Sequence, residues 1–209
     1  MGGYKPAALR RWDATGDSRL DAQGGYLLRV ESLRELDVAG LARSVLALEG
    51  LEADGVSLQL GIHPRRKVAR LAFRGARQFE GLAGARWHAT HHLMASQLSL
   101  RTGAAVQAYA VLPGELEKVV TYGNGRQVGG ETLSYDDVEL TDEQASDDAA
   151  YALLQRSWPL GHLAHVFGLG REELLSLAGR PGLLLSLDGR ETIDLDALLP
   201  ETAPSLRMG

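Results

Sequence analysis

Three of the six histidines in this 209-residue chain lie within five positions, at His88, His91 and His92. Imidazole is a common zinc ligand and the side chain that most readily exchanges protons near neutral pH. His88 and His92 are four residues apart, so on a helix they lie one turn apart on the same side. A helical pair with this spacing can hold a metal ion if a third ligand completes the coordination.

No such ligand follows at a helical step, because residues 85–101 contain no Asp or Glu. A distant imidazole would have to supply it, and the alternatives are His63, His162 and His165. The simpler interpretation places His91 on the core face of the helix and His88 and His92 at its surface. We therefore expect no cofactor, and keep a zinc site formed by His88, His92 and His165 as the alternative.

Basic residues are concentrated between positions 65 and 86. They are Arg65, Arg66, Lys67, Arg70, Arg74, Arg77 and Arg86. Forked guanidinium donors suit carboxylates and phosphates. Few aromatic residues lie nearby for base stacking and the whole chain has a net charge of −5, so a nucleic-acid partner is not expected. We predict that a partner protein contacts Arg65, Arg66, Arg70, His88 and His92.

Charge is polarised along the chain. Residues 1–90 carry 14 Lys and Arg against 10 Asp and Glu, whereas residues 91–209 carry 8 against 17. Much of the negative charge lies between Glu131 and Asp148. Such a chain can attract a partner, or its two halves can attract each other, which is the simpler of the two interpretations.

The composition excludes several classes of protein. The absence of cysteine rules out disulfides, thiolate zinc sites and cysteine nucleophiles, and suits a reducing cytoplasm. No apolar run approaches the roughly 20 residues of a membrane span, and the first 20 residues do not form a signal peptide. No P-loop, nucleophile elbow or His-Glu-x-x-His motif is present. We expect a soluble cytoplasmic protein without a membrane partner.

Hydrophobic periodicity in residues 25–112 predicts the order β-α-β-β-α-β. A capping-box pattern at Ser32–Glu35 predicts a helix start, and this helix should end near Gly50. A second helix is expected over residues 85–101. Strands are expected at 26–30, 56–61, 68–73 and 105–112, followed by a hairpin of 118–122 and 126–133 around Gly123-Asn124-Gly125. This order is typical of a split β-α-β (ferredoxin-like) sandwich, here with an added hairpin, and indicates an α+β fold.

The rest of the chain is predicted to be a small helical module. Helices are expected from Thr141 to about Arg156, from Pro159 to Phe167 and from Arg171 to Ala178, before a hairpin of residues 183–187 and 192–195. The order resembles that of a winged helix. Its third helix, which would be the one that reads DNA, has Glu172 and Glu173 in its first turn. These carboxylates would repel phosphates, so we expect the module to pack or to dock protein.

These observations predict four segments. They are a flexible arm (1–24), an α+β sandwich domain (25–135), a helical module with a C-terminal hairpin (136–200) and a tail (201–209). The predicted function is that of a non-enzymatic protein-binding protein: a regulator, an adaptor or an immunity-type inhibitor. Two alternatives remain open, a metal-dependent enzyme using the helical histidine pair and a nucleic-acid-binding regulator acting through the C-terminal module.

Overall fold

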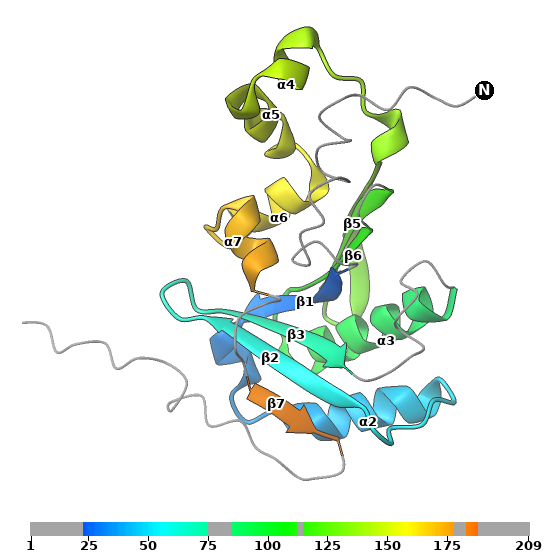
Figure 1. Cartoon of the computed structure of the whole chain (residues 1–209). Coiled ribbons are helices and arrows are strands. Elements are labelled where there is room, and N and C mark those ends of the chain that lie inside the picture. The colour runs from blue at the N-terminus through cyan, green and yellow to red at the C-terminus, as the bar shows by residue number, and fades with distance from the viewer. Residues whose placement is uncertain (1–22, 75–84, 113–114, 178–182, 188–209) are drawn as a thin grey trace, which may run out of the picture.

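The computed structural model of the chain describes residues 23–74, 85–112, 115–177 and 183–187. An open antiparallel sheet of seven strands is combined with helices, which confirms the predicted α+β class (Figure 1). The strand order is β6-β5-β4-β1-β3-β2-β7. The predicted arm and tail lie outside the described residues, apart from Gln23 and Gly24.

The strands are β1 (Gln23–Arg29), β2 (Ser57–His63), β3 (Val68–Arg74), β4 (Val106–Leu112), β5 (Leu116–Gly123), β6 (Arg126–Ser134) and β7 (Leu183–Ser186). All described neighbours are antiparallel. β1 lies between β3 and β4, although both of these follow it later in the chain. The β5–β6 turn has positive φ at Asn124 (49°) and Gly125 (77°), as the hairpin signal predicts.

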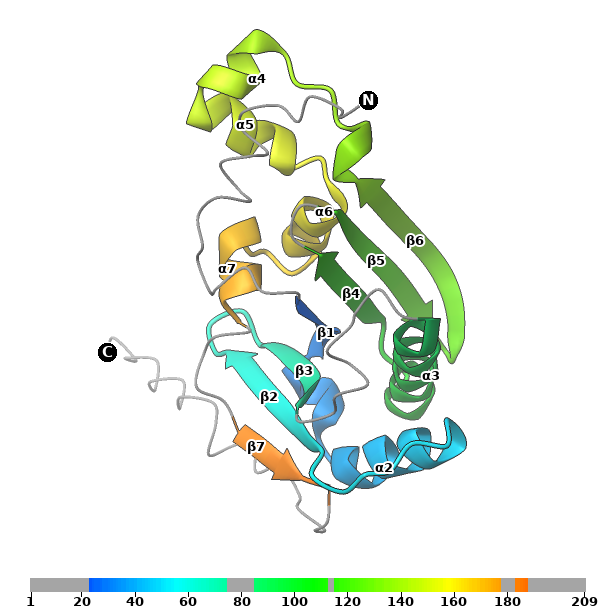
Figure 2. The same cartoon turned by 45° about the vertical axis from the view of Figure 1, so that its right-hand side comes forward.

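The helices are the short 3-10 turns η2 (Val30–Leu33) and η4 (Tyr135–Asp137) and the α-helices α2 (Val38–Leu48), α3 (Ala85–Thr102), α4 (Asp142–Ser146), α5 (Asp148–Gln155), α6 (Pro159–Val166) and α7 (Arg171–Ser176). α2 and α3 cover one face of the sheet, and α6 and α7 lie on the other (Figures 1 and 2). Because successive side chains of a strand point to opposite faces of the sheet, the strands contribute apolar side chains to two cores, one on each face.

The first core joins α2 and α3 to the sheet. Leu58, Leu60 and Leu71 point toward it from the strands, and Met94 and Leu98 point toward it from α3. These are the faces that the periodicity predicts. The side chain of His91, which we predicted on the core face of α3, lies outside the described residues.

The second core joins the C-terminal helices to the opposite face of the same sheet. Leu160, Leu163 and Phe167 pack with strand residues such as Leu27 and Tyr109. β7 extends this sheet by pairing with β2. The predicted hairpin partner of β7, residues 192–195, lies outside the described residues, and the division of the chain at residue 136 stays a prediction.

The predicted start of α2 at Ser32 is wrong. Glu35 has φ of 67°, a left-handed conformation that interrupts a helix, so the capping-box pattern falls on η2 and the turn after it. The helix begins at Val38 instead, where the Asp37 carboxylate accepts a hydrogen bond of 2.8 Å from the Gly40 amide. Asp is as good an N-cap as Ser, and here it closes the helix start.

The single helix predicted from Thr141 to Arg156 is divided into two. The Thr141–Gln144 capping box forms as expected, with both reciprocal hydrogen bonds present. Asp147 then adopts an extended backbone and caps α5 by accepting from the Ala149 amide at 2.8 Å.

Among the described residues, no helix is long and apolar enough to cross a membrane.

Candidate protein-binding surface

The turn between β2 and β3 presents a group of exposed cations, which we call the basic turn. Its members are Arg65, Arg66 and Lys67 of the turn and the neighbouring Arg29, which ends β1. The Arg29 guanidinium donates to the Arg66 carbonyl at 2.9 Å, and buried His63 accepts from the Arg66 amide through Nδ1 at 3.2 Å. The backbone of the turn is therefore held, while the Arg65 and Arg66 side chains form no ion pair with any described residue.

A single described carboxylate partially neutralises the basic turn. The Lys67 ammonium lies 3.3 Å from Glu31 Oε1. The pKa of Glu31 is lowered first by a hydrogen bond to its own backbone amide and then by Lys67, against the opposing effect of burial. The remaining cations can therefore attract an acidic partner.

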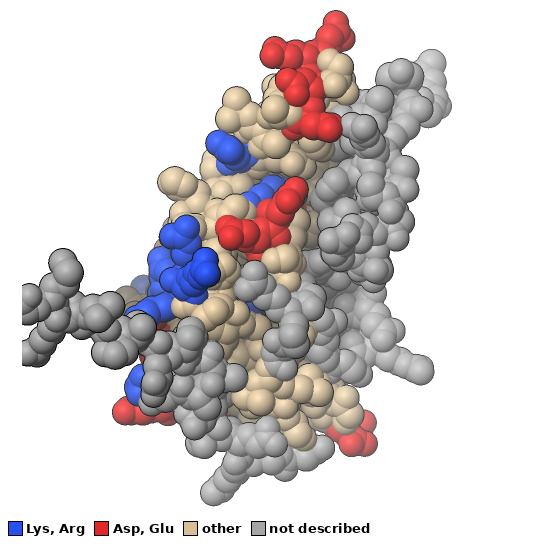
Figure 3. Space-filling model, turned by 60° about the vertical axis from the view of Figure 1, so that its left-hand side comes forward, with Lys and Arg blue, Asp and Glu red and all other residues tan. Residues whose placement is uncertain are grey.

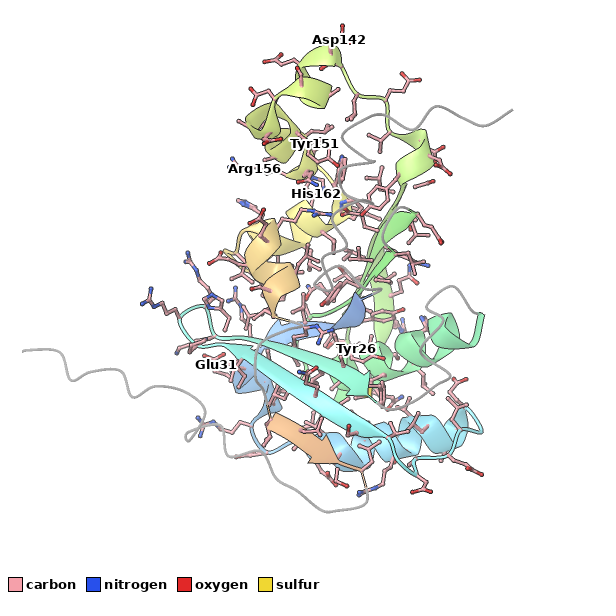
Figure 4. The ribbon with its side chains drawn as sticks, in the orientation of Figure 1. Tyr26, Glu31, Asp142, Tyr151, Arg156 and His162 are labelled. Atoms are coloured by element: carbon pink, nitrogen blue, oxygen red, sulfur yellow. The ribbon has the colours of Figure 1, made fainter. Side chains whose placement is uncertain are left out.

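The opposite charge gathers elsewhere, in what we call the acidic segment. It consists of exposed Asp136, Asp137, Glu139, Asp142, Glu143 and Asp147. Asp142 lies at the α4 end of the molecule and Glu31 lies near the basic turn, on the far side of α6 and α7 (Figure 4). Among the described residues, no ion pair joins the two groups. In Figure 3 one acidic group lies at the top of the molecule, away from the basic side chains, and a second lies directly beside them.

Arg70 is separated from the other predicted contact residues, because its side chain is only 3% exposed. Its Nε donates to the Tyr109 hydroxyl and its Nη2 to the Gly24 carbonyl, both at 2.6 Å. Gly25 makes room for it, since a Cβ there would lie 3.3 Å from Arg70 Nε. The structure therefore places Arg70 within the fold, while Arg65 and Arg66 remain on the surface.

The predicted histidine pair is only half described. His88 lies on α3, but its side chain is outside the described residues. His92 is exposed, and its Nδ1 lies 2.5 Å from the Tyr122 hydroxyl, with the two rings edge to face. Burial raises the pKa of Tyr122, which favours the phenol as the proton donor in this contact. His92 is thereby oriented against the sheet.

The structure does not bring His92 and His165 together. His165 is exposed on α6, on the opposite face of the sheet from α3. His162 contacts Glu131 at 2.9 Å, and His63 Nε2 lies 3.9 Å from Glu173. Within the described part of the chain, no group of three His, Asp or Glu residues is arranged to hold a metal ion.

A buried polar network that the sequence does not predict lies beneath α6 and α7. Glu117 of β5 is 0% exposed; its Oε2 accepts from the Leu160 amide at 2.9 Å, and its Oε1 accepts from the Tyr135 hydroxyl at 2.9 Å. Arg171 pairs with the same Oε1 and lies over the Trp158 ring, 5.7 Å from its centroid. The network ties the two C-terminal helices to β5.

This network is suited to fixing helices rather than to reaction chemistry. Burial, reinforced by the charge of Glu117, raises the pKa of Tyr135 far above that of an ordinary phenol, so its hydroxyl stays a hydrogen-bond donor. The Glu117 carboxylate also satisfies an amide at the start of α6, where helix amides otherwise lack partners. Nothing in the sequence near Glu117 indicates that it is buried, because an isolated acidic residue near the start of a strand is usually exposed at the surface.

Comparisons with protein-family models, with curated proteins and with solved structures find no match to the chain.

Proposed function

We propose that this chain is a soluble, cytoplasmic, non-enzymatic protein that binds another protein, acting as a regulator, an adaptor or an immunity-type inhibitor. The observation that supports this proposal is the separation of the basic turn from the acidic segment. Exposed charges of one sign that lack internal partners raise the rate of encounter with a complementary surface.

The basic turn is the proposed centre of contact. Arg65 and Arg66 are exposed and make no ion pair with described residues, and guanidinium groups bind carboxylates through two parallel hydrogen bonds. The Arg29–Arg66 hydrogen bond holds the turn in place before a partner arrives. An acidic patch on the partner would meet a positioned group of donors.

The proposal extends to the architecture that carries this turn. We propose that residues 23–112 form a split β-α-β sandwich of the ferredoxin-like type, supported by the central strand order β4-β1-β3-β2 and by two helices on one face. In that arrangement the β2–β3 turn lies at an end of the sheet, where a partner can approach it. The winged-helix order of the C-terminal module stays a prediction.

Affinity capture from native lysate tests the proposed function. The wild-type chain should retain a stoichiometric partner that is released by salt, and the double charge reversal Arg65→Glu/Arg66→Glu should weaken its binding at least tenfold. The matched control, Arg101→Glu/Arg156→Glu, reverses two exposed arginines away from the turn and should bind as wild type does. No stoichiometric partner across conditions, or equal capture by both double variants, would contradict the proposal.

A further inference from the structure

Among the described strands, β6 ends the sheet with an open edge. It is nine residues long, its residues 126–132 are all exposed, and β5 is its only partner among the described strands (Figure 2). An open strand presents a row of backbone amides and carbonyls that can pair with another strand.

This edge has few of the features that usually prevent an exposed strand from pairing with another chain. Arg126–Ser134 contains neither Pro nor Lys, and apolar Val128 is 67% exposed. Gly129 and Gly130 lie at its centre, and a Cβ at Gly129 would meet no atom within 4 Å. The protection that is present is a bulge, because the register with β5 shifts between Thr121 and Tyr122.

The bulge also decides which charges share a face. Arg126 pairs with Gly123, Gly129 with Thr121 and Glu131 with Val119. Alternate residues of β5 point to the same side, so these three β6 residues lie on one face of the sheet. In a regular strand, in which Val128 took its place in the alternation, Arg126 and Glu131 are five positions apart and would lie on opposite faces.

We propose that β6 pairs antiparallel with β6 of a second copy of this chain, with the two-fold axis at Gly129. Counting along the β5 register, Arg126 of one copy then faces Glu131 of the other, and the same pair forms a second time by symmetry. Gln127 faces Gly130, and the two Gly129 residues meet without side chains. The strand is thus complementary to itself.

Both charged groups are available for this pairing. Arg126 forms no ion pair with any described residue, and the Glu131–His162 contact engages only Oε2. The arrangement favours a second copy over an unrelated strand, because the complementary charge pattern is already present in β6. A parallel arrangement in register would instead place Arg126 beside Arg126 and Glu131 beside Glu131.

The dimer should be weak. One strand pair forms a small interface, and exposed ion pairs contribute little to affinity. Sedimentation analysis over a range of concentrations should show a weight-average mass that rises from 22.5 kDa toward twice that value. A mass that stays at 22.5 kDa up to millimolar concentration would overturn the proposal.

Charge-swap variants assign the association to β6. Arg126→Glu and Glu131→Arg should each shift the midpoint of dimerisation at least fivefold upward in concentration, because each creates two like-charge contacts. An equimolar mixture of the two variants, and the double variant Arg126→Glu/Glu131→Arg, should restore association. Arg156→Glu, a single exposed reversal away from β6, should leave it unchanged.

Two results would overturn this assignment. One is that Arg126→Glu and Glu131→Arg associate as strongly as the wild-type chain, and the other is that their equimolar mixture does not regain association. The proposal is separate from partner binding at the basic turn. Capture of the partner by Arg126→Glu should equal capture by the wild-type chain, so the failure of one proposal is distinguishable from the failure of the other.

Discussion

At the scale of single residues, the Glu117 carboxylate is the most consequential side chain among those described. It is fully buried and accepts hydrogen bonds from Tyr135, from the Leu160 amide and from Arg171. A buried carboxylate is costly unless donors surround it, and here three segments, η4, α6 and α7, supply its partners. The same dependence makes each partner sensitive to substitution.

Arg171→Met should lower the free energy of unfolding by about 3–5 kcal/mol, because it leaves Glu117 buried without its cation. The double variant Glu117→Gln/Arg171→Met should lose clearly less than the sum of the two single losses, since it removes both charges together. Urea titrations followed by far-UV circular dichroism measure these values. Additive losses would show that the two side chains do not stabilise each other.

Residue roles were only partly predictable from sequence. Exposure of Arg65 and Arg66 follows from a polar turn between two strands, whereas the burial of Arg70 depends on Gly25 and Tyr109, which come from two other strands. Glu117 and Arg171 are 54 residues apart in the chain, and the sequence around neither residue predicts that they pair. Hydrophobic periodicity identifies faces, but it does not identify which polar residue is drawn between them.

At the scale of elements, most helices and strands were predicted to within a few residues. Where prediction was wrong, a competing local signal was stronger: Asp37 rather than Ser32 capped α2, and Asp147 divided the last predicted long helix. Where several residues that can cap a helix follow one another, each is able to satisfy free amides at a helix start. The sequence pattern alone therefore does not show at which of them the helix begins.

The junction between α5 and α6 gives a sharp prediction about an element boundary. A Cβ at Gly161 would lie 2.3 Å from the Gln155 carbonyl oxygen and 2.5 Å from that of Arg156. Gly161→Ala should therefore destabilise the chain by about 1–3 kcal/mol, because rigid backbone has to move. Gly129→Ala meets open space and should change stability by less than about 0.5 kcal/mol. Equal losses in chemical denaturation would contradict this explanation.

At the scale of the whole molecule, the positions of β7 and of the C-terminal helices on the sheet could not be predicted from local patterns. That β7 pairs with β2, and that α6 and α7 cover the face opposite α2 and α3, result from contacts between distant segments. The same assembly leaves β6 open at one edge and places the two charged groups apart. Each proposed surface therefore depends on how the elements assemble. The sequence shows which residues are charged, but it does not show which of them lie together on one surface.

Assembly also buries tyrosines, with a consequence for stability at high pH. Burial is the main cause that raises the pKa of Tyr26, Tyr122, Tyr135 and Tyr151 above the ordinary value of 10.0. The folded chain therefore keeps these protons at a pH where the unfolded chain releases them. Their contribution to stability is complete below pH 10 and is lost as the pH rises toward the folded values.

The free energy of unfolding should accordingly fall above pH 10, by up to about 1.4 kcal/mol per pH unit for each tyrosine that stays protonated in the folded state. Urea titrations between pH 8 and 11 measure the slope, and Tyr135→Phe should reduce it by the share of one proton. Arginines keep their charge in this range, and the chain has only three lysines, so other titrations contribute little. Phenolate absorbance provides an independent check: these tyrosines should ionise only as the chain unfolds, and ionisation in the folded chain near pH 10 would contradict the prediction.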